Sequence, residues 1–210
     1  MNETNKLKNF FVIEGGDGSG KTTQINLLKK RYPGALFTRE PGGTVASEAI
    51  RELFFEHTRD LDPLAQLNLV YAARIQNVID NIAPALRDGR AVFCDRYQLS
   101  TYAYQLYVND RLDLMDDFLV TDRRLESLSA KPYYFFLDIQ PKDAVHRTYE
   151  RDEKTNVYDT MKLDFHEKIY QGYQNGIKDI PVSCTIIDAT QSIEQIHEDI
   201  VTVIEGIGKV

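Results

Sequence analysis

The chain has few cysteines and no long apolar run. Cys94 and Cys184 are its only cysteines, and both lie inside short apolar stretches. We interpret them as small core residues of a reducing compartment, not as a disulfide framework. No run approaches the eighteen apolar residues of a membrane span, and the N-terminal stretch has no small-residue cleavage site. We therefore expect a cytoplasmic, soluble protein with no membrane partner.

A surplus of basic residues is also missing. The 25 Lys and Arg are outnumbered by 32 Asp and Glu, which gives a formal net charge of −7. Because phosphate neutralisation needs clustered cations, this balance argues against a nucleic-acid partner. It leaves room for a small anionic ligand where a few cations converge. We find no internal repeat, low-complexity segment or linker, so we expect one domain over residues 1–210.

Short apolar runs alternate with longer stretches of helical period, as in α/β folds. The runs that predict strands are Phe10–Ile13, Ala35–Phe37, Ala91–Cys94, Tyr133–Leu137 and Cys184–Ile187. Each is apolar almost throughout, as expected for strands that are covered on both faces of a parallel sheet. The pattern predicts a three-layer fold, with a five-stranded doubly wound parallel sheet and flanking helices.

Two stretches show the helical period most clearly. Apolar residues recur every three or four positions from Leu64 to Leu86, which predicts one long amphipathic helix. Pro84 lies inside it and should kink it or mark a break near Asn81. The same spacing over Ile193–Ile204 predicts a C-terminal helix. In such folds, ligands bind beyond the carboxyl ends of the strands.

A glycine-rich loop follows the first predicted strand. Residues 15–22, GGDGSGKT, fit the pattern G-x-x-x-x-G-K-[ST], and a helical pattern follows. Glycines let consecutive backbone N–H groups surround phosphate oxygens, and the positive end of the helix points at the same place. We expect Lys21 to lie along the β- and γ-phosphates and the Thr22 hydroxyl to hold Mg²⁺. The loop residues predicted to bind ATP are Gly15, Gly16, Asp17, Gly18, Ser19, Gly20, Lys21, Thr22 and Thr23.

The sequence does not support several other classes of nucleotide-binding protein. No Asn-Lys-x-Asp tetrad, which a GTPase needs to read guanine, is present, and the chain has no room for the further modules of a motor ATPase. A small phosphoryl-transfer enzyme is the leading class, and it must also hold an acceptor. Arg39 and Arg96 follow the second and third predicted strands, close to the expected phosphate site. Either one, taken alone, could equally be an exposed surface cation.

Arg74 adds a third cation near the apolar face of the long predicted helix. An unpaired guanidinium there is costly unless an anion meets it. The residues four positions away, Val70 and Val78, offer no carboxylate. A ligand anion is therefore favoured over a salt bridge within the helix, although both remain open.

Several motifs together resemble those of the thymidylate kinases. In chain order they are E-G-G-D-G-S-G-K-T-T-Q, T-R-E-P-G-G-T, Y-A-A-R, D-R-Y-x-x-S-x-x-A-Y-Q, L-D-I-x-P and D-A-T. The resemblance covers nearly the whole chain. It implies a P-loop NTPase-type fold, a homodimer, and Mg²⁺-dependent, in-line transfer of a phosphoryl group from ATP to dTMP. The alternatives are a kinase for another deoxynucleoside monophosphate, a deoxynucleoside kinase, and a catalytically weak nucleotide-binding homologue.

The resemblance also implies roles for single residues. Arg74 would hold the acceptor phosphate with help from Arg39 and Arg96, and Asp17 would meet the 3′-hydroxyl of the acceptor sugar. Tyr104 would crowd the 2′ position and Thr101 would face the base edge. Without the resemblance, Asp17 is equally a turn residue and Tyr104 a packed core aromatic. The residues predicted to bind the acceptor are Asp17, Arg39, Pro41, Val70, Arg74, Arg96, Thr101 and Tyr104.

Catalysis is expected to depend on Lys21, Asp95, Arg96 and Arg151. Asp95 closes an apolar strand in the Walker B manner and is predicted to position Mg²⁺ through water. Residues 145–160 resemble the lid of bacterial thymidylate kinases, which supplies a cation that the phosphate loop lacks. The phosphate loop here likewise has Gly18 where a eukaryotic-type member carries arginine.

Within this lid, Arg151 is the predicted lid cation, and Arg147 is predicted to pack against adenine. The alternative is that residues 151–154, RDEK, form a solvated charge run.

Two positions depart from the family pattern. The family usually has a phenylalanine that stacks on thymine where this chain has Val70. Weaker binding, a looser base preference, or an aromatic side chain supplied from elsewhere could each result, because base stacking contributes about 1–3 kcal/mol. In the lid, Asn156–Asp159 replaces the familiar D-R-I-E, so that one arginine is missing.

Overall fold

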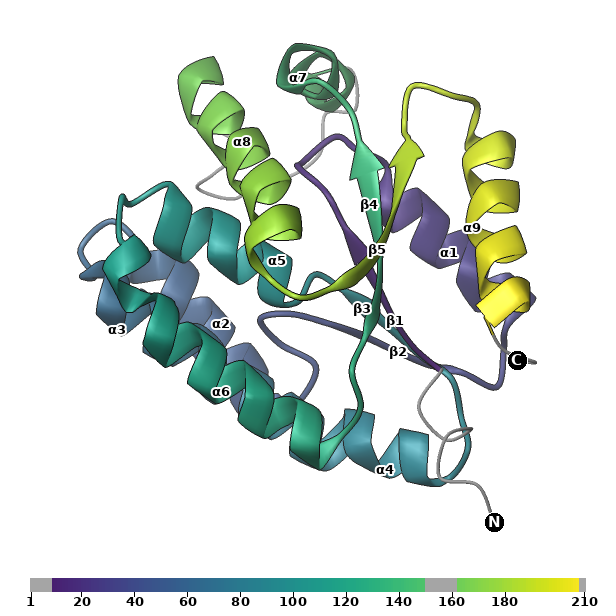
Figure 1. Cartoon of the computed structure of the whole chain (residues 1–210), viewed down its shortest axis with the longest axis horizontal. Helices are drawn as coiled ribbons and strands as arrows, with labels where there is room; N and C mark the ends of the chain where they lie inside the picture. Colours follow the sequence, from purple (N-terminus) through teal and green to yellow (C-terminus); the bar gives the residue numbers. More distant parts are fainter. Residues whose placement is uncertain (1–8, 150–161, 208–210) are drawn as a thin grey trace.

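A parallel five-stranded sheet forms the centre of the molecule. The computed structural model describes residues 9–149 and 162–207. The strands lie in the order β2-β3-β1-β4-β5, and each neighbouring pair is parallel. Their bounds are Phe10–Glu14 (β1), Leu36–Arg39 (β2), Val92–Asp95 (β3), Tyr133–Asp138 (β4) and Ser183–Asp188 (β5). The predicted doubly wound α/β fold is confirmed, with helices on both faces of the sheet (Figure 1).

Every strand continues past its apolar run to a charged residue. These last residues are Glu14, Arg39, Asp95, Asp138 and Asp188. Because parallel strands end at the same edge, the sheet brings these charges to one side of the molecule. This edge is where the predicted phosphate loop and arginines lie.

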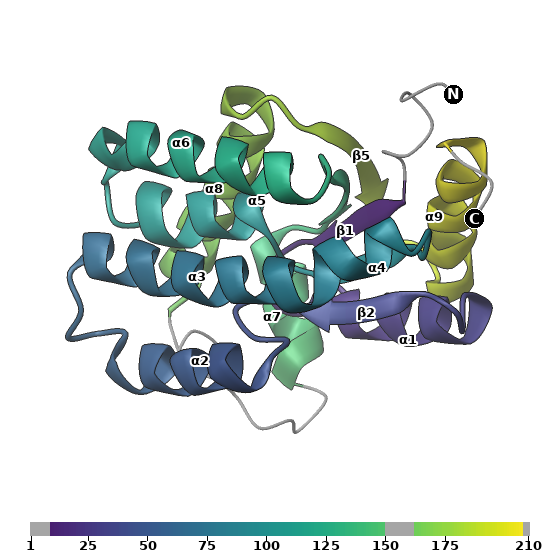
Figure 2. The same cartoon turned by 90° about the horizontal axis from the view of Figure 1, so that it is seen from below.

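Alternate residues of the strands enter two separate cores. Phe10 and Val12 point into the larger core, and Phe11 and Ile13 point into the smaller one. Helices α1 (Lys21–Arg31) and α9 (Ile193–Ile207) cover the smaller core. On the other face, α3 (Pro63–Asn77), α5 (Gln98–Thr101), α6 (Met115–Leu128) and α8 (Leu163–Asp179) cover the larger core, as Figure 2 shows.

The long helix predicted between Leu64 and Leu86 is present as one helical stretch. It consists of α3, a π-helical turn over Val78–Ile82, and α4 (Ala83–Arg87). In the turn, the Ala83 N–H donates to the carbonyl of Val78, one residue further back than in an α-helix. The irregularity expected before Pro84 is therefore a wider turn and not a break.

The remaining helices complete the helical layers. They are α2 (Val45–His57), α7 (Pro141–Tyr149), a π-helical segment Tyr102–Tyr107 and a 3₁₀ turn Leu112–Leu114. No helix of the described residues is long and apolar enough to cross a lipid bilayer.

The expectation that all five strands are covered on both faces is wrong for the two edge strands. Side chains of β2 are half-buried or exposed, and Ile186 of β5 is 51% exposed. Each edge strand has a sheet neighbour on one side only, and the helices do not extend fully over it. Cys184 on β5 is accordingly only half-buried, whereas Cys94 on β3 is buried, and both thiols are free.

Candidate active site

The phosphate loop connects β1 to the N-terminus of α1, as predicted. The Lys21 ammonium donates to the carbonyl oxygens of Gly15, at 2.9 Å, and Gly16, at 2.8 Å. Burial and the neighbouring Arg96 lower the pKa of Lys21 to about 8. The lysine is therefore folded back against the carbonyl groups of its own loop.

Gly18 is the position where any side chain would collide with α7. Its φ is +81°, and an added Cβ would lie 2.2 Å from the carbonyl oxygen of Ala144. Both the backbone conformation and the contact restrict this position to glycine. The absence of an arginine here, noted from the sequence, thus has a steric cause.

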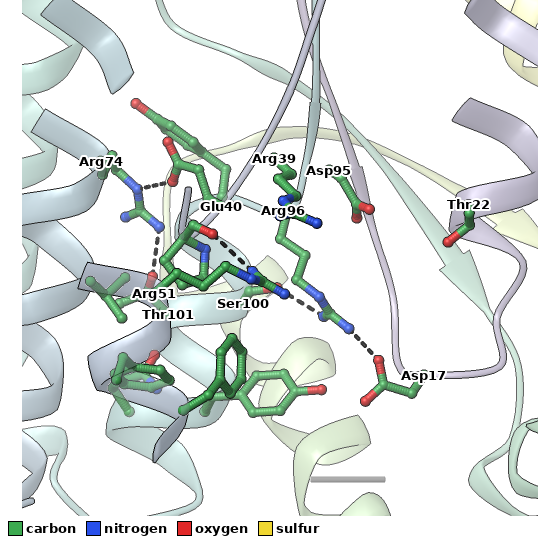
Figure 3. Close-up of a pocket in the computed structure, with 17 residues that line it drawn as sticks. Asp17, Thr22, Arg39, Glu40, Arg51, Arg74, Asp95, Arg96, Ser100 and Thr101 are labelled. Atoms are coloured by element: carbon green, nitrogen blue, oxygen red, sulfur yellow. Dashed lines mark hydrogen bonds and ion pairs between the residues drawn. The ribbon is translucent and has the colours of Figure 1, made fainter. Parts of the chain in front are cut away.

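A cavity of about 270 Å³ opens beside the loop at the carboxyl edge of the sheet (Figure 3). All eight residues predicted for the acceptor line it, together with the predicted metal residues Thr22 and Asp95. They come from the phosphate loop, the ends of β2 and β3, α3, and the segment that follows β3. The structure therefore brings together positions that are up to 87 residues apart, from Asp17 to Tyr104.

Arg96 connects the phosphate loop with α5 and α8. Its guanidinium pairs with the Asp17 carboxylate at 2.5 Å and donates to the hydroxyls of Tyr173, at 2.8 Å, and Ser100, at 3.2 Å. The backbone of Arg96 has a φ of +67°, which is unusual for a residue other than glycine. The guanidinium also donates to the Gly15 carbonyl at 3.1 Å, so four hydrogen bonds and the strained backbone hold this cation next to the phosphate loop.

Glu14, at the end of β1, holds Ser100, one of the partners of Arg96, in place. It is fully buried and accepts from the backbone N–H groups of Tyr97 (2.7 Å) and Ser100 (3.1 Å) and from the Ser100 hydroxyl (2.6 Å). Burial raises the pKa of its carboxyl group. Glu14 thus fixes the start of α5, which carries Ser100 and Thr101 into the cavity.

Arg74 forms ion pairs with carboxylates of its own chain. It is 1% exposed, donates to Glu40 at 2.5 Å and to the Thr101 hydroxyl at 2.7 Å, and has Asp122 of α6 3.7 Å away. These carboxylates come from other parts of the chain and not from the helix of Arg74, a pairing that the sequence argument did not consider. Burial raises the pKa of Asp122 to about 7.

Val70 lies on the cavity wall as expected, where it is 5% exposed. Phe54 and Phe55 of α2 line the same cavity. Phe54 is 2% exposed and Phe55 is half-buried. Of the three consequences considered for Val70, the supply of an aromatic side chain from another helix agrees with this geometry.

A second cavity, of about 310 Å³, lies on the α1 and α9 side of the phosphate loop. Ser19, Gly20 and Thr23 of the predicted ATP set line it, together with Arg147 of α7. Arg147 donates to the Ala189 carbonyl at 2.9 Å, which holds it beside the D-A-T segment. The predicted adenine contact of Arg147 stays a prediction. Arg151 and Asn156–Asp159 lie outside the described residues, and so does most of the predicted lid.

Thr22 and Asp95 fit the predicted metal. Both line the main cavity, and Asp95 Oδ1 is buried with no hydrogen-bond partner among the residues that the structure describes. A hydroxyl and a free carboxylate oxygen are the hard oxygen donors that Mg²⁺ prefers. In the described part of the chain, no group of three or more His, Cys, Asp or Glu could hold a metal ion by itself.

Sequence reasoning missed several residues of the site. Glu14 and Glu40 stand inside the quoted motifs, but a carboxylate within an apolar strand or before a proline gave no role by itself. Arg51 of α2 and Tyr173 of α8 carry no local signal, because only the folded chain brings them to the sheet edge.

The fold and the phosphate loop are those of a P-loop nucleotide-binding protein, with one cavity on each side of the loop. Comparison with known proteins agrees. The family model described as thymidylate kinase matches residues 13–200. A thymidylate kinase of Roseiflexus castenholzii is 36% identical, over 93% of this chain and 92% of the relative. One of Bacillus licheniformis is also 36% identical, over 93% and 94%.

The crystal structure of the Ehrlichia chaffeensis thymidylate kinase matches 93% of this chain and 97% of its own, with a TM-score of 0.68 and 28% identity. The chain belongs to the thymidylate kinase family. The resemblance found in the sequence motifs is therefore confirmed.

Proposed function

We propose that this chain transfers the γ-phosphoryl group of ATP to dTMP, producing ADP and dTDP. The observation that carries this proposal is the main cavity, in which the predicted acceptor residues surround one space beside the phosphate loop. The curated relatives, which are named thymidylate kinases, support the same activity.

The acceptor itself can act as the nucleophile without a general base. Its 5′-phosphate is mostly a dianion at neutral pH, because the second pKa of a phosphate monoester is about 6. One of its oxygens forms a bond to the γ-phosphorus, while the bond from that phosphorus to the β–γ bridging oxygen breaks and leaves its electrons on ADP. Lys21, Arg39 and Arg96 offset the negative charge that gathers along this line.

The remaining residues would orient the acceptor. Asp17, which Arg96 holds in place, would accept from the 3′-hydroxyl, and Tyr104 would fill the space at the 2′ position. Arg74 donates to Thr101, the residue predicted to face the base edge. Glu40 already compensates the charge of Arg74. We therefore propose that Arg74 lies at the base end of the cavity and that other arginines bind the acceptor phosphate.

Thr22 and Asp95 would hold Mg²⁺, Asp95 through water. Bound there, the ion would supply charge neutralisation for the transferred phosphoryl group. Arg151 as an additional lid cation stays a prediction.

A coupled ADP-release assay tests the acceptor. We expect turnover with dTMP well above that with dUMP, dCMP, dAMP and dGMP, and none with free thymidine, since a nucleoside lacks the attacking phosphate. Preferred turnover of another monophosphate would assign a different base specificity, and preferred turnover of nucleosides would indicate a deoxynucleoside kinase. ATP binding without any turnover would leave a binding protein and contradict the proposal.

We also propose the homodimer that the resemblance implies. Apolar side chains stay exposed on neighbouring helices, with Ile79 at 51% and Val120 at 58%. Burying them against a second copy would be favourable. Light scattering should give twice the mass of one chain, and a single-chain mass at micromolar concentration would contradict the dimer.

A further inference from the structure

Glu40, the carboxylate that pairs with Arg74, has a second partner at the end of α3. Asn77, the last residue of this helix, donates from Nδ2 to Glu40 Oε1 at 3.4 Å, while Arg74 donates to Glu40 Oε2 at 2.5 Å. All three side chains are buried, with Asn77 at 0%, Arg74 at 1% and Glu40 at 3% exposed. Because a buried carboxylate without donors is costly, these two bonds set the orientation of Glu40.

The neighbours of Asn77 fix which way its amide group points. The Gly43 carbonyl can only accept, and it receives Asn81 Nδ2 at 2.7 Å. The same nitrogen lies 3.1 Å from Asn77 Oδ1, and the Thr38 hydroxyl donates to that oxygen at 3.0 Å. With two donors on its oxygen, the Asn77 amide must turn its nitrogen toward Glu40.

The irregular turn after α3 takes part in this arrangement. The π-helical turn Val78–Ile82 begins directly after Asn77 and contains Asn81. Gly43 packs against the same group, since an added Cβ there would lie 2.5 Å from Asn77 Oδ1. Such turns occur frequently at functional sites. Here the turn joins the end of α3 to the loop that follows Glu40.

From Glu40 the contacts continue to the base end of the cavity. Arg74 lies between Glu40 and Thr101, whose hydroxyl accepts from it at 2.7 Å (Figure 3). Because a guanidinium is planar and rigid, the direction of its Nε–H bond to Glu40 also sets the direction of its two Nη groups. Burial raises the pKa of Glu40, whereas Arg74 and Asn77 lower it. Asn77 thus both orients this carboxylate and favours its charged form.

We propose that Asn77 is a positioning residue for base recognition, which holds Glu40, and through it Arg74, in the orientation that donates to the acceptor base. The inference rests on the proposed function, because it assigns the support of the base end of the same site. Thymine presents a carbonyl oxygen where cytosine presents an amino group. A guanidinium held in this orientation therefore favours dTMP over dCMP.

The test compares these two monophosphates. Their dissociation constants would be measured by calorimetry, dCMP in competition with dTMP, for the natural chain and for Asn77→Leu, which removes the amide with little change in volume. We expect dTMP to bind about tenfold more weakly to the variant, as for the loss of one buried hydrogen bond, whereas dCMP changes by less than about twofold. An equal loss for both ligands would indicate a merely structural role and overturn the inference, as would unchanged dTMP binding.

Gln66 offers a matched control on the same helix. It is also a buried amide, and its Nε2 donates to the carbonyls of Thr58, at 2.8 Å, and Leu61, at 3.1 Å. It does not line the main cavity. Gln66→Met should therefore leave the ratio of the two dissociation constants unchanged. If the ratio falls as far as in Asn77→Leu, any loosening of α3 has this effect and the inference is wrong.

An exchange of groups between positions 40 and 77 tests the contact itself. In Glu40→Gln, an amide oxygen that keeps the bond to Arg74 turns the amide nitrogen toward Nδ2 of Asn77, so that donor faces donor. Adding Asn77→Asp supplies an acceptor again. We expect Glu40→Gln/Asn77→Asp to bind dTMP at least about threefold more tightly than Glu40→Gln alone. Absence of any recovery would overturn the inference, and this comparison decides the question if Asn77→Leu does not fold.

The result is distinguishable from a failure of the proposed function. Turnover of dTMP together with an ineffective Asn77→Leu would overturn only the role of Asn77. A loss of binding confined to dTMP, in a chain that turns over no monophosphate, would keep the role of Asn77 and reject the kinase activity. If the natural chain binds dTMP no more tightly than dCMP, both are rejected.

Discussion

Charge compensation organises the site at the scale of single residues. Glu40, Asp17 and Glu48 hold three arginines in defined positions before any nucleotide binds. The sequence predicts Arg39 and Arg96 because they follow apolar strands, and Arg74 because it lies near the apolar face of a helix. It cannot pair Arg74 with Glu40, which stands 34 positions earlier. Their contact depends on how α3 packs against the end of β2. Removing one partner of a buried pair leaves an uncompensated charge, so Glu40 is as necessary to the site as Arg74.

Lys21 gives the site a pH dependence. In the protein without nucleotide its pKa is lowered to about 8, so that the ammonium loses its proton as the pH rises through that value. Phosphates favour the charged form and raise the pKa again. We therefore expect ATP affinity to fall above about pH 8, and ATP binding to take up a proton near pH 8.5.

Calorimetry in two buffers of different ionisation enthalpy measures this uptake. At about pH 8.5 the apparent binding enthalpy should differ between Tris and HEPES in proportion to the protons taken up, and at pH 6.5 Lys21 should contribute nothing to the difference. Lys21→Arg, which does not titrate in this range, is the control. Identical enthalpies in both buffers at pH 8.5 would contradict the assignment.

At the scale of elements, close packing of α8 carries Tyr173 to Arg96. A Cβ added at Gly172 would lie 2.9 Å from Ala103 Cα and 3.3 Å from Tyr107 Cβ, in the π-helical segment after α5. The helix can approach this closely only because position 172 has no side chain. Tyr173, the next residue, is thereby buried with its hydroxyl between Arg96 and Ser100.

Gly172→Ala should therefore destabilise the protein. We expect its free energy of unfolding to fall by roughly 1–3 kcal/mol, as for other overpacked contacts. Gly206→Ala on α9 is the matched control, since nothing lies within 4 Å of its added Cβ and alanine favours a helix. Urea unfolding compares the two variants. If Gly172→Ala is as stable as Gly206→Ala, the close packing does not constrain α8.

Long periodic elements and buried strands could be predicted from the sequence, whereas local irregularities could not. The stretch Leu64–Leu86 is helical as predicted, but Leu64 is 41% and Ile75 37% exposed although both fit the apolar period. Burial depends on which neighbour covers a helix, and periodicity contains no information about that. The same reason explains why β2 and β5 looked like central strands.

Of all parts of the whole molecule, the phosphate loop could be predicted most completely, because the residues of its motif are contiguous in the sequence and share one function. The acceptor cavity could be predicted only as a set of positions, since five segments of the chain must fold together to enclose it. Arg51 and Phe55 escaped prediction for this reason. They lie on α2, which begins only after the T-R-E-P-G-G-T motif has ended and carries none of the quoted motifs.

The reaction that we propose for the whole molecule is the direct transfer of one phosphoryl group from ATP to dTMP. Chromatographic quantification of all nucleotides in a single reaction with ATP, dTMP and Mg²⁺ tests it most directly. We predict that dTDP and ADP appear in equal amounts, and that neither forms when dTMP is omitted. ADP released without dTDP, or at the same rate in the absence of dTMP, would show that the protein hydrolyses ATP and does not transfer its phosphoryl group to dTMP.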